Sequence, residues 1–384
     1  MKAAGETVMN RTGPWERLLT CAGSAVDFMF LAPPKLARPF KRMRRITRED
    51  YEDEADFYIE GGYADRPETF FSFPSSTPPY SIIERRAYHD GESQLIRYDS
   101  GYMAKNPLLR ERYHSYAANR HGYLVRWTHG DGNRKTILCH HGYMLGSPAQ
   151  AKRMFRMRKL FSLGLDVALF IAPFHWRRSA GPLMQRGIYL QPDDAAMTCE
   201  CVGQNMHDLH GAFRILRDLG SADIGLIGAS LGGYNTALFI SLTDMASFGA
   251  MMVPAFNFSR PLGPDTARFP FKVDGDLREK TKRVWELHSP LNFHPKIPVD
   301  RILVVASRGD LICPFDYVGV LCDRWGVTRR RFLTGGHWLI FDRGLRGTAW
   351  YQFIKEMGFI NGNPDPGAPG LFPQRHAGIT CARV

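Results

Sequence analysis

The chain of 384 residues is 44% hydrophobic and 12% aromatic, which is enough apolar material for one large buried core with extensions. Its formal net charge of +12 favours anionic partners in general, but the arginines are dispersed and no nucleic-acid motif accompanies them, so we expect no nucleic-acid partner. The seven scattered cysteines are an odd number, which argues against a disulfide framework and favours a reducing compartment such as the cytoplasm.

Residues 1–79 are predicted to form an N-terminal extension, which begins without the apolar core of a secretory signal. An apolar helix is expected over Leu18–Leu31, and Asp27 together with the short length argues against a membrane span. A basic run follows, made up of Lys35, Arg38, Lys41, Arg42, Arg44, Arg45 and Arg48. Two interpretations stay open: residues 15–48 rest peripherally on the anionic inner face of a membrane, or the helix docks on the protein body or on a second copy beside a solvated basic connector.

From residue 80 onward the pattern predicts a β-hairpin and then alternating strands and helices. Asp90-Gly91 is a turn signal between the strands Glu84–His89 and Ser93–Tyr98, and an exposed antiparallel strand follows at Tyr123–Thr128. The alternation beyond it implies parallel crossover connections. The expected elements are strands near 137–140, 167–172, 224–227, 248–253, 301–306 and 331–333, and helices near 149–161, 202–216, 234–240 and 350–357.

A histidine-glycine turn, His140-His141-Gly142-Tyr143, ends the first of these parallel strands. Such a turn can place a donor where an attacked carbonyl becomes an oxyanion, and Tyr143 would donate through its backbone N–H or its hydroxyl. The adjacent histidines also raise the question of a metal, but no acidic or histidine ligand follows at a metal-binding spacing. We therefore expect no metal, and expect His141 to brace the loop by hydrogen bonding.

The run Gly228-Ala229-Ser230-Leu231-Gly232 lies between an apolar strand and a helix-like stretch, which is where a nucleophile elbow belongs. A serine hydroxyl must be lifted out on a tight turn to meet a histidine on one side and a carbonyl on the other, and the flanking glycines permit that turn. The alternative is a glycine-rich connection that only packs a helix tightly on the sheet. If the elbow is functional, the N–H of Leu231 is an oxyanion donor.

Two further polar residues follow predicted strands downstream. Asp310 comes just after the strand at 301–306, and His337 follows Gly335-Gly336 after the strand at 331–333. Taken alone, Asp310 is compatible with a turn residue or a helix N-cap, and His337 with an ordinary histidine. Taken with Ser230, they favour an acid and a general base.

The segment 255–299 is rich in phenylalanine and is punctuated by prolines. It contains a predicted helix at Leu277–Leu287, which either covers Ser230 as a lid or belongs to an ordinary packed connection. No carboxylate stands directly after the strand that precedes this segment. Asp310 is therefore favoured as the acid over Asp265 and Asp274.

Together, residues 80–360 resemble the α/β-hydrolase superfamily at the elbow, the histidine-glycine loop, the Gly-Asp turn and the Gly-His turn. The resemblance implies a mostly parallel sheet with helices on both faces. It implies Ser230 as nucleophile, Asp310 as acid and His337 as base, in the order of that family, with no cofactor. The chain lacks the glycine run that lipases carry after His141-Gly142.

The implied activity is a serine hydrolase that cleaves an ester, thioester or amide through an acyl-enzyme, most simply an esterase or lipase-like enzyme. Its substrate would be a small-molecule or lipid acyl compound, and Met144, Trp338 and Phe256 would line the substrate-binding site. The alternatives are an acyltransferase using the same triad and a non-catalytic membrane-associated scaffold. Residues 361–384 are expected to form a flexible tail, and the sequence gives no oligomeric state.

Overall fold

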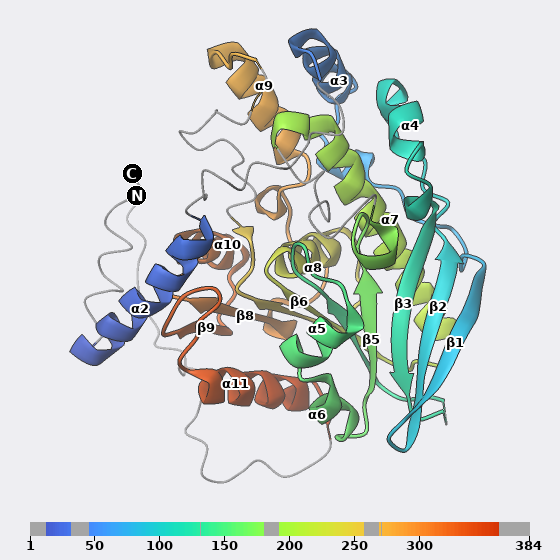
Figure 1. Ribbon diagram of the computed structural model, residues 1–384, viewed down its shortest axis with the longest axis vertical. Helices are drawn as coiled ribbons and strands as arrows, with labels where there is room; N and C mark the ends of the chain where they lie inside the picture. Colours follow the sequence, from blue (N-terminus) through green and yellow to red (C-terminus); the bar gives the residue numbers. More distant parts are fainter. Residues whose placement is uncertain are drawn as a thin grey trace.

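A nine-stranded sheet organises the computed structural model, which describes residues 13–31, 46–130, 132–179, 192–256, 269 and 271–360. The strand order is β1-β2-β3-β5-β4-β6-β7-β8-β9 (Figure 1). The strands are β1 (Tyr80–Tyr88), β2 (Gly91–Asp99), β3 (His121–Thr128), β4 (Thr136–His140), β5 (Asp166–Ile171), β6 (Ile224–Ala229), β7 (Phe248–Met252), β8 (Ile302–Ser307) and β9 (Arg330–Leu333). The pairs β1–β2, β2–β3 and β3–β5 are antiparallel, and every pair from β5 to β9 is parallel.

The helices that accompany the sheet are distributed on both of its faces. They are α2 (Pro14–Leu31), α3 (Arg48–Glu60), α4 (Pro107–His114), α5 (Pro148–Met154), α6 (Met157–Phe161), α7 (Ala195–Asp218), α8 (Leu231–Leu242), α9 (Gly275–Glu286), α10 (Phe315–Trp325) and α11 (Arg343–Glu356). Figure 1 shows α6 and α11 on one side of the sheet and α8 and α10 on the other.

Alternate residues of the central strands supply two separate cores, one on each face. Leu226 of β6 packs with the core that includes α7 and α8, whereas its neighbour Ile227 packs with the core that includes α6 and α11. Because both faces are covered, strands β4 to β8 are buried along their whole length, which explains their apolar sequences. This architecture is the α/β-hydrolase fold, as the sequence predicts.

Several predicted elements differ in detail from those observed. The helix expected over 149–161 is two helices, α5 and α6, because Arg156 between them has a left-handed backbone with φ +49°. The strand expected to be exposed at Tyr123–Thr128 is largely buried, since β3 is an interior strand between β2 and β5. The helix expected near 202–216 is α7, which begins earlier, at Ala195, and buries most of its polar residues as well as its apolar ones.

The burial of α7 on its polar side comes from the segment before the sheet and from the loop after β2. Tyr58 of α3 donates a hydrogen bond to Glu200 at 2.8 Å, and Tyr102 donates to the same carboxylate at 2.6 Å. The backbone N–H groups of Lys105 and Asn106 also donate hydrogen bonds to the Glu200 carboxylate, each at 3.0 Å. Helix α3 is therefore tied to the helices that cover the sheet through α7.

Parts of the predicted N- and C-terminal segments lie outside the described residues. These parts are residues 1–12, the basic run as far as residue 45, and the tail at 361–384. In the ranges that the structure covers, none of the helices has the length and apolar character needed to cross a membrane.

An ion pair with both side chains fully buried fixes the loop after β5 to α7. Arg178 and Asp208 meet at 2.6 Å. The guanidinium also donates to the backbone oxygens of Ile171 and Asn119, and Ser100 donates to the Asp208 carboxylate. The loop and the helix are therefore held together by charge-assisted hydrogen bonds in a site without water access.

We expect Arg178→Ala to lower the free energy of unfolding by about 3–5 kcal/mol, because Asp208 would be left as an unpaired buried charge. The adjacent Arg177 pairs with Glu84 at 2.6 Å but is 42% exposed, so Arg177→Ala should change the free energy by only about 0–1 kcal/mol. Chemical denaturation of the two variants measures the difference. Equal effects would contradict this account of the buried pair.

Candidate functional site

Ser230 occupies the sharp turn between β6 and α8. Its backbone angles are φ +56° and ψ −119°, a combination that a residue with a side chain rarely adopts. The flanking glycines are required for steric reasons. A Cβ on Gly228 would lie 2.0 Å from the oxygen of Gly232, and a Cβ on Gly232 would lie 2.0 Å from the oxygen of His140. The predicted elbow is therefore present as a strained, closely packed turn.

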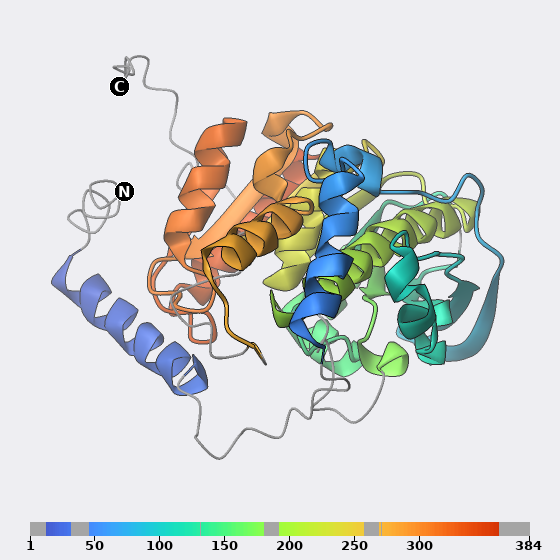
Figure 2. The same ribbon diagram turned by 90° about the horizontal axis from the view of Figure 1, so that it is seen from above.

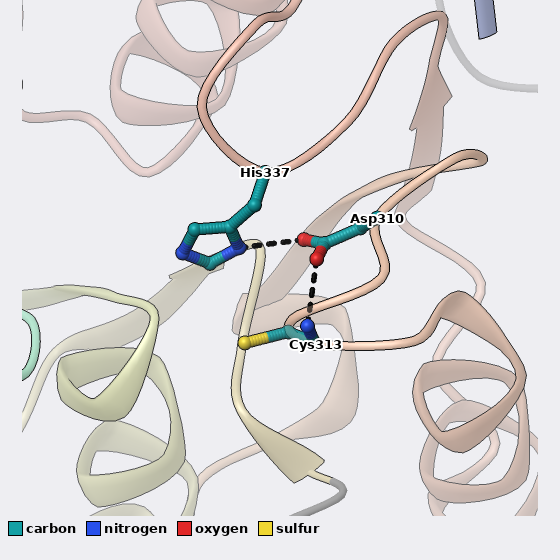
Figure 3. Close-up of side chains that lie close together, drawn as sticks. All are labelled: Asp310, Cys313 and His337. Atoms are coloured by element: carbon teal, nitrogen blue, oxygen red, sulfur yellow. Dashed lines mark hydrogen bonds and ion pairs between the residues drawn. The ribbon is translucent and has the colours of Figure 1, made fainter. Parts of the chain in front are cut away.

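Asp310 and His337 are brought together at the ends of two neighbouring strands. Asp310 follows β8 and His337 follows β9, and the Oδ2 of Asp310 is 2.7 Å from the Nδ1 of His337 (Figure 3). The other carboxylate oxygen accepts the backbone N–H groups of Ile312 at 2.9 Å and Cys313 at 2.6 Å. The carboxylate is thus fixed in orientation, and it favours the tautomer of His337 with its proton on Nδ1.

Cys313 is a member of this cluster that no sequence motif indicates. Its Sγ lies 3.8 Å from the Oγ of Ser230 and within 4.8 Å of a ring nitrogen of His337. In this resting arrangement the Ser230 hydroxyl therefore contacts the thiol of Cys313 and not the imidazole of His337. Catalytic hydrogen bonds of this kind often tighten only when substrate is present. A single cysteine three residues after an aspartate carries no signal that identifies it.

Burial and hydrogen bonding oppose each other in setting the pKa values of this cluster. Burial raises the pKa of Asp310 and that of the Cys313 thiol, which favours the uncharged thiol near neutral pH. Burial alone would lower the pKa of His337. The hydrogen bonds to Asp310 and Cys313 outweigh it and leave the pKa of His337 raised. A proton on His337 is thus stabilised by the partners that face the ring.

Asp310, Cys313 and His337 are also the side chains, within the described ranges, whose potential ligand atoms gather closely enough for a metal, all within 4.8 Å of one another. Both carboxylate oxygens of Asp310 are already engaged, one by the His337 ring and the other by two backbone N–H groups. A metal ion would have to displace the bond to His337. The present hydrogen bonding therefore suits proton transfer better than metal ligation.

The histidine-glycine loop lies directly beside Ser230. A Cβ on Gly142 would lie 3.3 Å from the Cβ of Ser230. His141 braces this loop, because its Nδ1 is 2.8 Å from the oxygen of Gly142 and its Nε2 accepts the N–H of Ala172 at 3.1 Å. A second brace, His175, accepts the N–H of Met144 at 3.2 Å. The loop is held close to the serine by histidines at the ends of β4 and β5.

The first turn of α8 begins directly after Ser230. Leu231 is the first residue of α8, and the first N–H groups of a helix have no acceptor within the helix. Tyr143, the other expected oxyanion residue, follows Gly142 in the braced loop and is partly buried. The two expected donors therefore come from elements that meet at Ser230.

The three residues expected to line the substrate differ in accessibility. Trp338 is 50% exposed, with its ring centre 5.5 Å from that of His337, and Met144 is partly buried with φ +58°. Phe256 is fully buried among the residues of the core that includes α7 and α8. It therefore offers no surface to a ligand in this arrangement.

The described part of the segment 255–299 is packed against other helices. The expected helix is α9, which begins after the N-cap Asp274 and buries Leu277, Val284 and Trp285 in the core. This packing favours the connection over the lid for α9 itself. Residues 257–268 and 270, including Asp265, lie outside the described residues.

A second residue that the analysis of motifs missed is Asp27. Its buried carboxylate accepts the backbone N–H of His337 at 2.7 Å, although the two residues are 310 positions apart. The only signal in the sequence is that Asp27 is an acidic residue inside an otherwise apolar helical stretch.

Comparison with known proteins identifies the fold of the chain. No family model matches the chain. Two uncharacterized proteins of Mycobacterium tuberculosis, from strains CDC 1551 / Oshkosh and ATCC 25618 / H37Rv, are 28% and 27% identical to it over 323 residues, covering 81% of this chain and 76% of each relative. The acetyl xylan esterase from Paenibacillus sp. R4 superposes with a TM-score of 0.51 at 14% identity, covering 81% of this chain and 99% of that one. The resemblance to α/β-hydrolases is confirmed at the level of the fold.

We expect the pKa of His337 to lie above 6.5, the ordinary value for a histidine, because the Asp310 carboxylate stabilises the protonated ring. The substitution Asp310→Asn should therefore lower the pKa of His337. Since the folded pKa is raised, this interaction stabilises the fold fully below about pH 6.5 and is lost as pH rises through the folded pKa. NMR titration of the histidine rings measures both values, with His337→Gln to assign the resonance. An unchanged pKa in Asp310→Asn would contradict the pairing.

Proposed function

We propose that the protein is a serine hydrolase that cleaves a carboxylic ester through an acyl-enzyme on Ser230. The observation that carries the proposal is the meeting of three elements at one edge of the sheet: the strained turn of Ser230, the braced loop at Gly142, and the Asp310–His337 pair. Each is a part that acyl transfer requires, namely a nucleophile, oxyanion donors and an oriented base.

The first half-reaction forms the acyl-enzyme. The step requires an unprotonated His337 ring, a form that becomes more abundant as the pH rises because the pKa of His337 is raised. In that form the Ser230 hydroxyl turns from Cys313 toward the Nε2 of His337, which takes its proton as Oγ attacks the carbonyl carbon. The resulting oxyanion accepts hydrogen bonds from the N–H groups of Leu231 and Tyr143. His337 then gives its proton to the leaving alcohol, and Asp310 stabilises the imidazolium in between.

The second half-reaction regenerates the enzyme. Water gives a proton to His337 while its oxygen attacks the acyl carbon, and the Ser230 oxygen leaves with the proton held by His337. Cleavage of an ester is the version that we favour because the structural neighbour is an acetyl xylan esterase. The exposed Trp338 beside His337 offers an apolar contact for the acyl or alcohol part.

A fluorophosphonate probe tests the nucleophile without knowledge of the substrate. We expect labelling of the wild-type protein and complete loss in Ser230→Ala, because the probe needs an activated serine oxygen. His337→Gln should slow labelling by roughly 100-fold or more. Ser162→Ala, which alters an exposed serine after α6, is the matched control and should label normally. Labelling that persists in Ser230→Ala would reject this nucleophile.

We also propose that the outer face of α2 rests on an anionic membrane from the cytoplasmic side. The face opposite the one docked on the protein carries exposed apolar side chains: Trp15 (69% exposed), Leu18 (58%), Phe28 (63%) and Met29 (69%). The basic run of the sequence follows this helix directly, and each basic residue near an anionic surface adds about 1 kcal/mol of attraction. Burial of the apolar side chains and electrostatic attraction would therefore both contribute to membrane binding.

Sedimentation with lipid vesicles tests this surface. We expect binding to phosphatidylcholine vesicles that contain phosphatidylserine, weaker binding at high salt, and at least about tenfold weaker binding of the double variant Phe28→Ser, Met29→Ser. Val320→Ser removes an exposed apolar side chain from α10 and serves as the control. Absence of wild-type binding to these vesicles would refute the proposal.

A further inference from the structure

The carboxylate of Asp27 lies buried between α2 and the two loops that carry Asp310 and His337. Its Oδ2 accepts the backbone N–H of His337 at 2.7 Å and that of Leu311 at 3.1 Å, and its Oδ1 accepts the N–H of Trp338 at 3.2 Å. One side chain of the N-terminal extension therefore bonds to the residue after the acid, to the base itself, and to the residue after the base.

The backbones of α2 and these loops also approach each other too closely for side chains. A Cβ on Gly23 would lie 2.0 Å from the nitrogen of Gly336, and a Cβ on Gly336 would lie 2.6 Å from the Oδ2 of Asp27. Ser24 of α2 donates a hydrogen bond to the oxygen of Gly309 at 2.8 Å. This close approach places α2 directly against the loops that carry Asp310 and His337, which follow β8 and β9 (Figures 1 and 2).

The loop that carries His337 is closed by two hydrogen bonds of its own, from the N–H of Gly336 to the oxygen of Leu339 at 2.8 Å and from the N–H of Phe341 to the oxygen of Thr334 at 3.0 Å. The start of the loop is fixed because the oxygen of Gly335 accepts hydrogen bonds from the hydroxyl of Ser307 at 2.6 Å and from the N–H of Gly309 at 2.8 Å. Gly335 itself has φ +120°, which only glycine adopts readily. The N–H of His337 donates to Asp27 and not to an acceptor within the loop. The ring of His337 is thus held by Asp310, whereas the backbone of the same residue is held by a helix outside the sheet.

We propose that Asp27 is a positioning residue, which holds His337 at the distance and angle that proton transfer with Ser230 requires. The inference rests on the proposed serine hydrolase function. Without the carboxylate, buried backbone N–H groups lose their acceptor and the loop shifts to find another. A displacement of a reacting group by about 1 Å can lower the rate roughly 100-fold.

Asp27→Asn is the sharpest variant, since it keeps the shape of the side chain but replaces one acceptor oxygen with an NH2 group that cannot accept a hydrogen bond. Glu16→Gln makes the same change of charge on an exposed residue of the same helix and is the matched control. With p-nitrophenyl acetate, we expect kcat of Asp27→Asn to fall roughly 10- to 100-fold with KM within about twofold of wild type. Glu16→Gln should match wild type.

Hydrogen–deuterium exchange separates local positioning from global instability. We expect Asp27→Asn to exchange faster at residues 309–313 and 335–339 while the strands of the sheet keep their wild-type protection. Faster exchange throughout the sheet, in step with the loss of kcat, would show a general loss of stability and overturn the positioning role.

The kinetic outcomes distinguish the two proposals. If wild type hydrolyses the ester and Asp27→Asn has the same kcat, the role of Asp27 is overturned while the proposed function stands. If wild type neither hydrolyses the ester nor reacts with a fluorophosphonate, the proposed function fails, and the role of Asp27 fails with it whatever the exchange shows.

Discussion

Ser230 can project its hydroxyl from the end of β6 only because its backbone takes a left-handed conformation that costs a residue with a side chain on the order of 1–3 kcal/mol. Surrounding hydrogen bonds hold it there. Its N–H donates to Met252 at 2.9 Å, and its oxygen accepts the N–H groups of Tyr234 and Ala255, each at 3.1 Å. The strain is therefore sustained by β7 and α8, and the glycines at 228 and 232 let β4 and α8 close around the turn.

The sheet then gathers the remaining groups at the same edge. Because β4, β6, β8 and β9 are parallel, the loops that follow them meet although they lie far apart in the sequence. The backbone donors to Asp310 lie in its own loop, and the Gly142 loop is braced by His141 and by His175 from the loop after β5. The base is supported differently, since the loop of His337 is bonded to α2. The N-terminal extension thus belongs to the geometry of the site as well as to the surface of the molecule.

Much of this arrangement follows from local sequence. Glycine spacing after an apolar strand indicates the elbow, and the positions of Asp310 and His337 just after predicted strands place them at one edge of the sheet. What local patterns cannot show is a contact between distant segments. Asp27 and Cys313 acquire their roles only through tertiary packing, and Phe256 is buried within the core that includes α7 and α8. The break at Arg156 was missed because the residues on either side keep a continuous helical pattern.

The structure also explains why a lone polar residue in an apolar helix was informative. Burying the carboxylate of Asp27 would cost free energy in a membrane, and it also costs free energy in a protein core unless the carboxylate accepts hydrogen bonds. The three N–H groups of the loops after β8 and β9 meet that requirement. The same carboxylate that argues against a membrane span therefore marks the side of α2 that docks on the protein, and the opposite side remains apolar and exposed.

Trapping the acyl-enzyme tests the central claim most directly. The protein is mixed with p-nitrophenyl acetate, quenched in acid within the first turnovers, and digested for peptide mass spectrometry. The account predicts one acetyl group on Ser230, bound as an oxygen ester. An acetyl group on Cys313, or turnover with no adduct on Ser230 in the first turnovers, would contradict it.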